Sequence, residues 1–155
     1  MMVIFRFGWA KPVPINMRKF KNPKRGMAIT ALAGPVSNLL LAAVMMGLYG
    51  LLYSTLSASS AGSTILQLIY YTAYISIALG IFNLIPIPPL DGSKVLFSAL
   101  SEASYYKLMR YERYGMILLI VVMFMGVLST PMSNAVSFVL DKLFYIAQGV
   151  YNLTT

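Results

Sequence analysis

Three long apolar runs, separated by short polar segments, set the pattern of the chain. Uncharged residues fill 33–53 without a break, and a second uncharged run covers 65–85. Each is close to the ~20 residues with which an α-helix crosses the hydrocarbon core of a bilayer. The third run, 115–128, is shorter, and its length alone fits either a span or a buried helix. Its flanking tyrosines favour a short or tilted third span.

The two ends of the chain have weaker patterns. Residues 132–153 place apolar side chains at helical spacing beside the charged pair Asp141 and Lys142, which predicts an amphipathic interfacial helix or an imperfect fourth span. Prolines at the start of the chain disfavour a helix there. We therefore expect an irregular strand at the membrane surface with Trp9 as an anchor, or a basic flank that only sets topology.

These patterns predict an all-α membrane protein: three transmembrane helices, a C-terminal amphipathic or fourth helix, and an irregular membrane-surface strand segment at the N-terminus. The whole chain, 1–155, is expected to form a single membrane domain. Its predicted parts are a surface segment (1–26), span 1 (27–56), span 2 (65–85), a proline hinge with Asp91 and a cytoplasmic helix (86–114), span 3 (115–129) and the amphipathic helix (132–153). We expect Pro131 to end the third apolar run.

Composition and charge support a lipid environment. Hydrophobic residues make up 59% of the chain and charged residues 10%, against ~45–50% and ~25% in soluble domains. Seven of the twelve cations precede the first run and four lie between the second and third, whereas 54–63 has none. This positive-inside pattern predicts a membrane protein whose segments 1–26 and 86–113 face the cytoplasm. The net charge of +8 is explained by the attraction of basic segments to anionic lipid headgroups, and we expect no binding to nucleic acid.

The segment NLIPIPPLDGSKV places the carboxylate of Asp91 directly behind a proline-rich break. Pro86 and Pro88 must end the second span near this point, because proline removes a backbone donor and clashes with the preceding turn. A carboxylate on such a stiff exit is suited to bind a metal ion or accept a proton. The simpler interpretation is that Asp91 or Ser93 only caps the following helix.

The segment AGPVSN places Asn38 one helical turn after Pro35. A side-chain amide in lipid needs partners, because no water is present to satisfy it. Its donor and acceptor can bind a neighbouring helix or the extended backbone of a substrate. Asn83 has the same two interpretations, and Gly34 permits close helix packing under either of them.

Three stretches in this order, FGWAKPVPIN, NPKRGMAITALAGPVSNLLLA and FNLIPIPPLDGSKVL, resemble the site-2 protease family, most closely its short bacterial members. The resemblance covers roughly residues 1–128. Members are intramembrane zinc metalloproteases that cleave substrate helices near the cytoplasmic face. Their zinc is held by the two histidines of an H-E-x-x-H motif and by the aspartate of a later N-x-x-P-x-P-x-x-D-G motif.

The resemblance implies roles for individual residues. The second motif is complete in this chain as Asn83, Pro86, Pro88, Asp91 and Gly92, so that Asp91 would be the third zinc ligand. The family's G-P-x-x-N motif corresponds to Gly34, Pro35 and Asn38. The resemblance implies that Asn38 helps to hold the substrate or the site, and we expect Asn83 to be a second substrate-binding residue. Residues 8–16 resemble the family's membrane-associated strand segment, whose edge could pair with an unwound substrate.

One departure from the family is severe, because the chain contains no histidine and no cysteine. Glu102 and Glu112 do not stand in an H-E-x-x-H setting, so no catalytic residue is assigned. One carboxylate is too few for catalytic zinc, which takes three protein ligands and a water. We therefore expect this chain to bind no catalytic zinc and to be inactive alone.

Three explanations remain open for the missing motif. The chain is N-terminally truncated, by a mis-called start or a broken gene; or a separate chain supplies H-E-x-x-H; or the protein is a non-catalytic scaffold, a pseudoprotease that binds transmembrane partners. The expected function is the C-terminal portion of a site-2-type metalloprotease, with membrane lipid and transmembrane protein substrates as partners. A transport component is a third class, disfavoured because the chain has no internal repeat.

Overall fold

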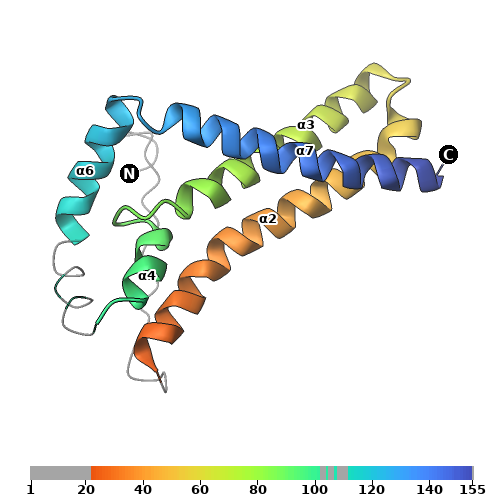
Figure 1. Ribbon diagram of the computed structural model, residues 1–155. Helices are drawn as coiled ribbons and strands as arrows, with labels where there is room; N and C mark the ends of the chain where they lie inside the picture. Colours follow the sequence, from red (N-terminus) through yellow and green to blue (C-terminus); the bar gives the residue numbers. More distant parts are fainter. Residues whose placement is uncertain (1–21, 102–103, 105–106, 108–111, 155) are drawn as a thin grey trace, which may run out of the picture.

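A computed structural model describes residues 22–101, 104, 107 and 112–154. Helices make up the regular structure of this part of the chain, and it contains no strand, which confirms the predicted all-helical fold (Figure 1). The predicted surface strand at the N-terminus lies outside the described residues. The helices are α2 (Pro23–Leu56), α3 (Ser60–Asn83), α4 (Asp91–Ser98), α6 (Glu112–Phe124) and α7 (Ser129–Thr154).

Helices α2 and α3 form an antiparallel hairpin, and each is long and apolar enough to cross a membrane. The side chain of Asn22 caps the start of α2 by accepting a hydrogen bond from the backbone N–H of Arg25, with Pro23 in the first turn where its missing donor does no harm. Pro35 lies inside α2 and is fully buried. The helix is assigned as continuous through it.

The hairpin turn is shorter than the polar composition of 54–63 suggests. α2 continues to Leu56 and α3 begins at Ser60, earlier than the predicted start of span 2 at residue 65. The Ser59 hydroxyl accepts a hydrogen bond from the N–H of Gly62 at 3.0 Å and so caps α3. Small polar residues favour turns but also favour N-caps, and here the capping role extends the helix.

The third apolar run differs from its predicted course. α6 ends at Phe124, and the chain turns at Gly126, whose φ of 68° is in the left-handed region that favours glycine. Pro131 does not end the run, because it lies in the first turn of α7, where proline is tolerated. Taken together, α6 and α7 are long and apolar enough to form one further membrane span, which would be bent by 85° at this break. The described residues thus contain two or three candidate membrane spans.

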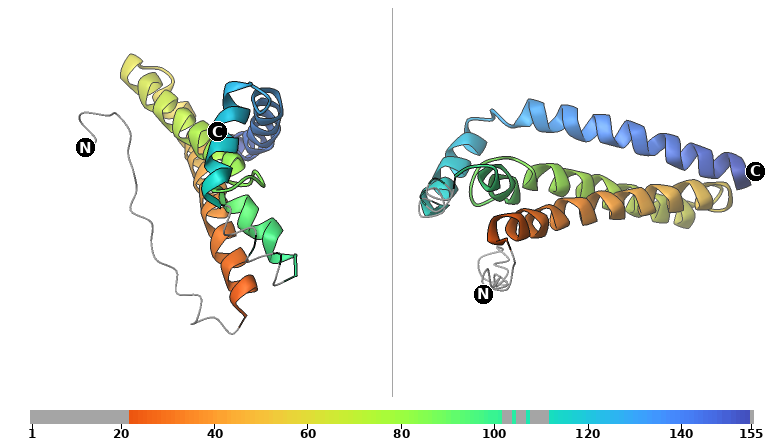
Figure 2. Two further views of the ribbon diagram at one scale, coloured as in Figure 1. Left: turned by 90° about the vertical axis from the view of Figure 1, so that its left-hand side faces the viewer. Right: turned by 60° about the horizontal axis from the view of Figure 1, so that its bottom comes forward.

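The core lies where α7 crosses the hairpin (Figures 1 and 2). The C-terminal end of α7 lies near the turn that joins α2 and α3. Small side chains let the helices approach closely, which is how packing stabilises helices in lipid. The buried cluster consists of Ala42, Met46, Ala73, Ile77, Val136 and Ala147.

Large apolar side chains remain exposed along the outside of α2 and α3. Leu40 and Leu68 are each 62% exposed, and Ile75 is 56% exposed. An apolar exterior of this extent is a liability in water but is the normal surface of a helix in contact with lipid. Together with two spans of sufficient length, it fits an integral membrane protein.

The contact of α2 with α7 predicts that two glycines one turn apart on α2 differ in their tolerance of a side chain. A Cβ on Gly50 would overlap the backbone carbonyl of Ala147, whereas a Cβ on Gly47 would have no atom within 4 Å. We expect Gly50→Ala to lower the free energy of unfolding by about 1–3 kcal/mol, as overpacking does. Gly47→Ala should leave it unchanged or raise it slightly. Unfolding in mixed detergent micelles measures both, and equal effects would contradict the packing.

Candidate functional site

The proline hinge between α3 and α4 is a compact, hydrogen-bonded turn. α3 ends in a tightened turn, in which the N–H of Leu84 donates to the carbonyl of Ile81 at 3.0 Å. The N–H of Leu90 then donates to the carbonyl of Ile87 at 3.0 Å, across Pro88 and Pro89, whose peptide bond is cis. Because proline has no N–H, these remaining donors set the path of the chain.

Gly92 closes the hinge against the end of α3. A Cβ at this position would overlap the carbonyl oxygen of Leu84, so only glycine fits. Ser93 is 2% exposed, and its hydroxyl donates to the carbonyl of Leu90 at 2.7 Å. The first turn of α4 is therefore packed on the last turn of α3, and Asp91, the first residue of α4, has little freedom of position.

The carboxylate of Asp91 lies against α2. Its Oδ2 is 3.4 Å from the position that a Cβ on Gly34 would occupy. Its Oδ1 is 3.3 Å from Nζ of Lys94, one turn further along α4. The side chains of Asp91 and Lys94 are 34% and 25% exposed. The hinge thus brings Asp91 to the helix that contains the G-P-x-x-N motif.

The capping interpretation of Asp91 is wrong. The N-cap of α4 is Leu90, which makes no side-chain cap hydrogen bond, and Asp91 is the first residue of the helix. Ser93 is not the cap either, because it lies inside the helix as its third residue, where its hydroxyl donates to the carbonyl of Leu90. A carboxylate in the first turn still interacts favourably with the helix dipole. Its two oxygens, however, lie near Lys94 and Gly34, outside the capping geometry.

α3 packs on α2 at the second candidate residue, Asn38. A Cβ on Gly80 would lie 3.2 Å from the carbonyl oxygen of Pro35 and 3.4 Å from Cβ of Asn38. Asn38 is half-buried, yet in the described part of the chain no hydrogen bond to its amide is found. The amide therefore does not join α2 to α3 by a hydrogen bond, although this was one of its two interpretations.

Asn83, the third candidate, is the last residue of α3 and is also half-buried. Within the described residues its amide likewise makes no hydrogen bond. Asn83 lies one turn beyond Gly80 on α3. Both asparagines thus flank the α2–α3 contact with amides whose donors and acceptors are open to a ligand.

Three residues that the motifs do not include also shape the site. Gly80 permits the α2–α3 contact, and Lys94 pairs with Asp91. Gly115 of α6 packs on the hinge, since a Cβ there would overlap Pro88. The i, i+3 spacing of Asp91 and Lys94 could have been recognised from a predicted helix. The two glycines had no such signal, because their partners are distant in sequence.

A further contact fixes the same end of the molecule. The Lys24 ammonium group, in the first turn of α2, donates to the carbonyl of Leu100 just beyond α4. This bond satisfies a carbonyl near the end of α4 and ties that helix to the start of α2. α4 is therefore held to α2 both at Asp91 and beyond its C-terminal end.

The residues of this chain do not by themselves fit a zinc ion. In the described ranges no group of three histidine, cysteine, aspartate or glutamate side chains comes together. The sequence has four acidic residues and neither histidine nor cysteine. Asp91 offers one hard oxygen ligand, whereas a zinc centre takes three or four protein ligands. Asp91 can be one member of a metal centre but cannot form one alone.

Comparison with known proteins identifies the family. The model of peptidase family M50 matches residues 47–129, which is more than half of the chain and includes the hinge and Asp91. The chain belongs to peptidase family M50. The resemblance to site-2 proteases drawn from the motifs is thereby confirmed.

Curated relatives of this M50 chain are named as metalloproteases. "Putative zinc metalloprotease YwhC" of Bacillus subtilis is 35% identical over 127 residues, covering 78% of this chain and 56% of YwhC. "Putative zinc metalloprotease SA1105" of Staphylococcus aureus is 40% identical over 85 residues, covering 55% of this chain and 19% of the relative. The chain thus spans about half the length of YwhC and less of SA1105. No solved structure matches it.

The ion pair at the site makes a prediction about stability. Asp91→Asn and Lys94→Met should each lower the free energy of unfolding by less than about 1 kcal/mol, because the pair is partly exposed and lies within one helix. Their effects should be less than additive, since both remove the same interaction. Detergent unfolding of the single and double variants measures this, with the exposed Lys107→Met as control. A loss of several kcal/mol in Asp91→Asn alone would contradict it.

Proposed function

We propose that this chain is the Asp91-bearing portion of an M50, site-2-type intramembrane zinc metalloprotease. In this proposal it needs an H-E-x-x-H segment, from its own gene or from another chain, before it can hydrolyse peptide bonds in membrane-embedded substrates. Family membership supports the protease class. The observation that carries the proposal is the approach of Asp91 Oδ2 to Gly34, which brings the two motif segments together.

The position and exposure of Asp91 support the proposed role of third zinc ligand. One oxygen faces α2 and the other lies near Lys94, so the carboxylate is oriented without being enclosed. With 34% of its side chain exposed, it remains accessible to a cation and to further ligands. In the full metal centre, zinc would supply a Lewis acid and an activated water. Because the other ligands are absent from this sequence, the chain alone is expected to be inactive.

The two asparagines are proposed to bind substrate. Asn38 and Asn83 flank the contact between α2 and α3, and their amides make no hydrogen bond within the described structure. A substrate helix must unwind before hydrolysis, which exposes backbone N–H and C=O groups in a medium without water. An amide can donate to and accept from such a backbone at once. The asparagines would thereby stabilise the extended segment next to Asp91.

The site is proposed to face the cytoplasm, in the bacterial cytoplasmic membrane. Lys24, Arg25, Lys94 and Lys107 all lie near the Asp91 end of the spans or in the segment after α4, whereas 54–63, around the opposite turn, has no cation. The positive-inside rule assigns the basic end to the cytoplasm. Residues 8–16, outside the described part of the chain, remain a predicted edge for substrate pairing.

A non-catalytic scaffold is the alternative, favoured by the absence of histidine from the sequence. It would use the same asparagines and hinge to bind single-span partners without cutting them. Such complexes would be stable in detergent and insensitive to zinc chelators.

Reconstitution tests the proposal. We expect the purified 155-residue chain to leave a membrane-embedded model substrate intact and to hold no stoichiometric zinc by elemental mass spectrometry. Co-expression with a family H-E-x-x-H helix should yield a complex with about one zinc ion and measurable cleavage. Asp91→Asn should abolish both, whereas Asp141→Asn on α7 should abolish neither.

Two outcomes would overturn the proposal. Cleavage by the chain alone would show that the site is complete without imidazoles. Zinc retention unaffected by Asp91→Asn in the reconstituted complex would remove Asp91 from the metal centre. Stable, chelator-insensitive binding of single-span partners without cleavage, in the presence of the added helix, would favour the scaffold.

A further inference from the structure

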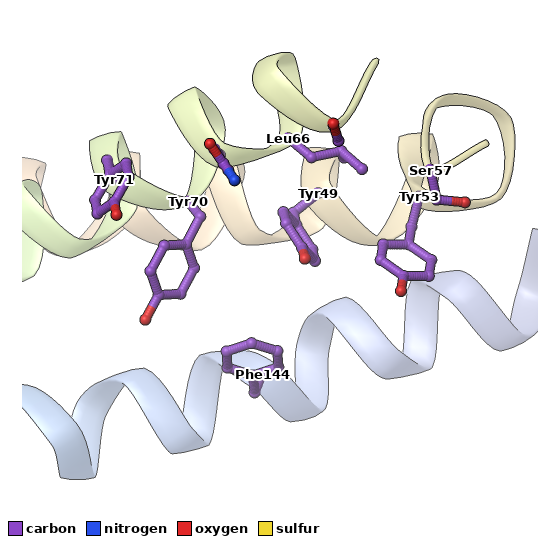
Figure 3. A pocket seen from close by; sticks show the side chains of 9 residues that line it. Tyr49, Tyr53, Ser57, Leu66, Tyr70, Tyr71 and Phe144 are labelled. Atoms are coloured by element: carbon purple, nitrogen blue, oxygen red, sulfur yellow. The ribbon is translucent and has the colours of Figure 1, made fainter. Parts of the chain in front are cut away.

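A pocket lies at the end of the molecule opposite Asp91, between α2, α3 and α7 (Figure 3). Tyr49 is fifteen positions after Gly34 on α2, which places it about 22 Å along the helix axis from the candidate metal ligand. The pocket has a volume of about 460 Å³, within the ~300–1,000 Å³ of small-molecule sites. It therefore belongs to a different part of the molecule from the site described above.

Aromatic rings form the walls of this pocket. Tyr49 and Tyr53 of α2 and Tyr70 of α3 point toward α7, from which Phe144 points back between them (Figure 3). The ring centroids of Tyr49 and Phe144 are 6.4 Å apart, and those of Tyr70 and Phe144 are 6.3 Å apart. The rings thus support one another in edge-on and tilted contacts, which fix the walls without filling the space.

Four polar side chains in the pocket lack hydrogen-bond partners among the residues that the structure describes, whereas the Ser63 hydroxyl donates to the carbonyl of Ser60 at 2.8 Å. No hydrogen bond between described residues involves the phenol hydroxyls of Tyr49, Tyr53 or Tyr70, or the amide of Gln67. Tyr49 and Tyr70 are half-buried. Next to the hydrocarbon, such groups need a partner. Several neutral donors and acceptors therefore converge on one space.

The lining has no charge, which narrows the class of ligand. The other lining residues include Ser57 and Ser63, and no Lys, Arg, Asp or Glu is among them. An anionic or cationic group would lose hydration here without gaining a counter-ion. Neutral hydroxyl groups can instead exchange hydrogen bonds with phenols, serines and an amide.

The surroundings of the pocket indicate that a ligand with neutral hydroxyl groups would be a lipid. The pocket extends from Ser57, at the turn between the two spanning helices, inward along α3 to Tyr70. Its outer part is therefore at the level where headgroups meet tyrosine side chains. Exposed apolar side chains continue from it along the helices, among them Leu51 and Leu68, at 46% and 62% exposure. Acyl chains can lie along these side chains while the headgroup enters the pocket.

We propose that this pocket binds the uncharged sugar headgroup of a glycosyl diacylglycerol. A pyranose ring has an apolar face that packs on tyrosine and phenylalanine rings, and a rim of hydroxyls that can reach the phenols and Gln67. This site is independent of Asp91 and of proteolysis, so its test and that of the proposed function can fail separately.

Native mass spectrometry of the full chain in a non-glycosidic detergent tests the proposal. The probes are monoglucosyl diacylglycerol, phosphatidylglycerol and phosphatidylethanolamine with identical acyl chains. We expect the glucosyl lipid to bind at least about tenfold more tightly than either phospholipid, through hydrogen bonds that a charged headgroup cannot match. A soluble alkyl glucoside should displace it from the unmodified protein.

Variants separate the pocket from the rest of the lipid-facing surface. Tyr70→Phe combined with Gln67→Leu removes two polar groups at similar volume and should abolish the preference. Tyr74→Phe, on the same helix but outside the lining, should preserve it. Equal binding of the three lipids, a preference for either phospholipid, failure of the alkyl glucoside to compete, or a preference that persists in the double variant would overturn the proposal.

Discussion

The packing of Gly92 on the carbonyl of Leu84 is the constraint on which the candidate site depends. Prolines end α3, but proline alone leaves the direction of the following chain open. Because Gly92 has no side chain, α4 can begin directly against the end of α3. Asp91, one residue earlier, is thereby placed beside Gly34 of α2. Without this contact, the chain after α3 could turn away from the hairpin formed by α2 and α3.

Glycines make the same kind of contact throughout the molecule. Gly80 brings α3 to Pro35 and Asn38, Gly115 brings α6 to Pro88, and Gly50 brings α2 to α7. In lipid, burial of apolar surface provides little force between helices, so stability depends on close packing. Contacts that hold the fold together thus also determine where the polar groups of the site lie.

The elements with strong local signals were predictable from sequence. The uninterrupted apolar runs identified α2 and α3, and the motifs identified the family, whereas the metal-binding role of Asp91 stays a prediction. The bend at Gly126 was not predicted, because nothing in an apolar run indicates which residue has a positive φ. The end of the run was instead predicted at Pro131, which in the structure lies in the first turn of α7. The capping interpretation of Asp91 failed because capping is judged locally, whereas its partners, Gly34 and Lys94, depend on the tertiary fold. The tyrosine pocket also depends on which rings α7 faces.

Disulfide trapping in the membrane tests most directly whether the hinge holds residue 91 against α2. The natural chain has no cysteine, so an engineered pair reports without background. Gly34→Cys combined with Asp91→Cys should cross-link rapidly under mild oxidation, because the end of the Asp91 side chain lies 3.4 Å from the position of a Cβ on residue 34, and disulfides join residues whose side chains meet at such short range. Leu41→Cys combined with Asp91→Cys, two turns further along α2, should remain reduced. Failure of the first pair to cross-link, or equal cross-linking of both pairs, would contradict this account of the site.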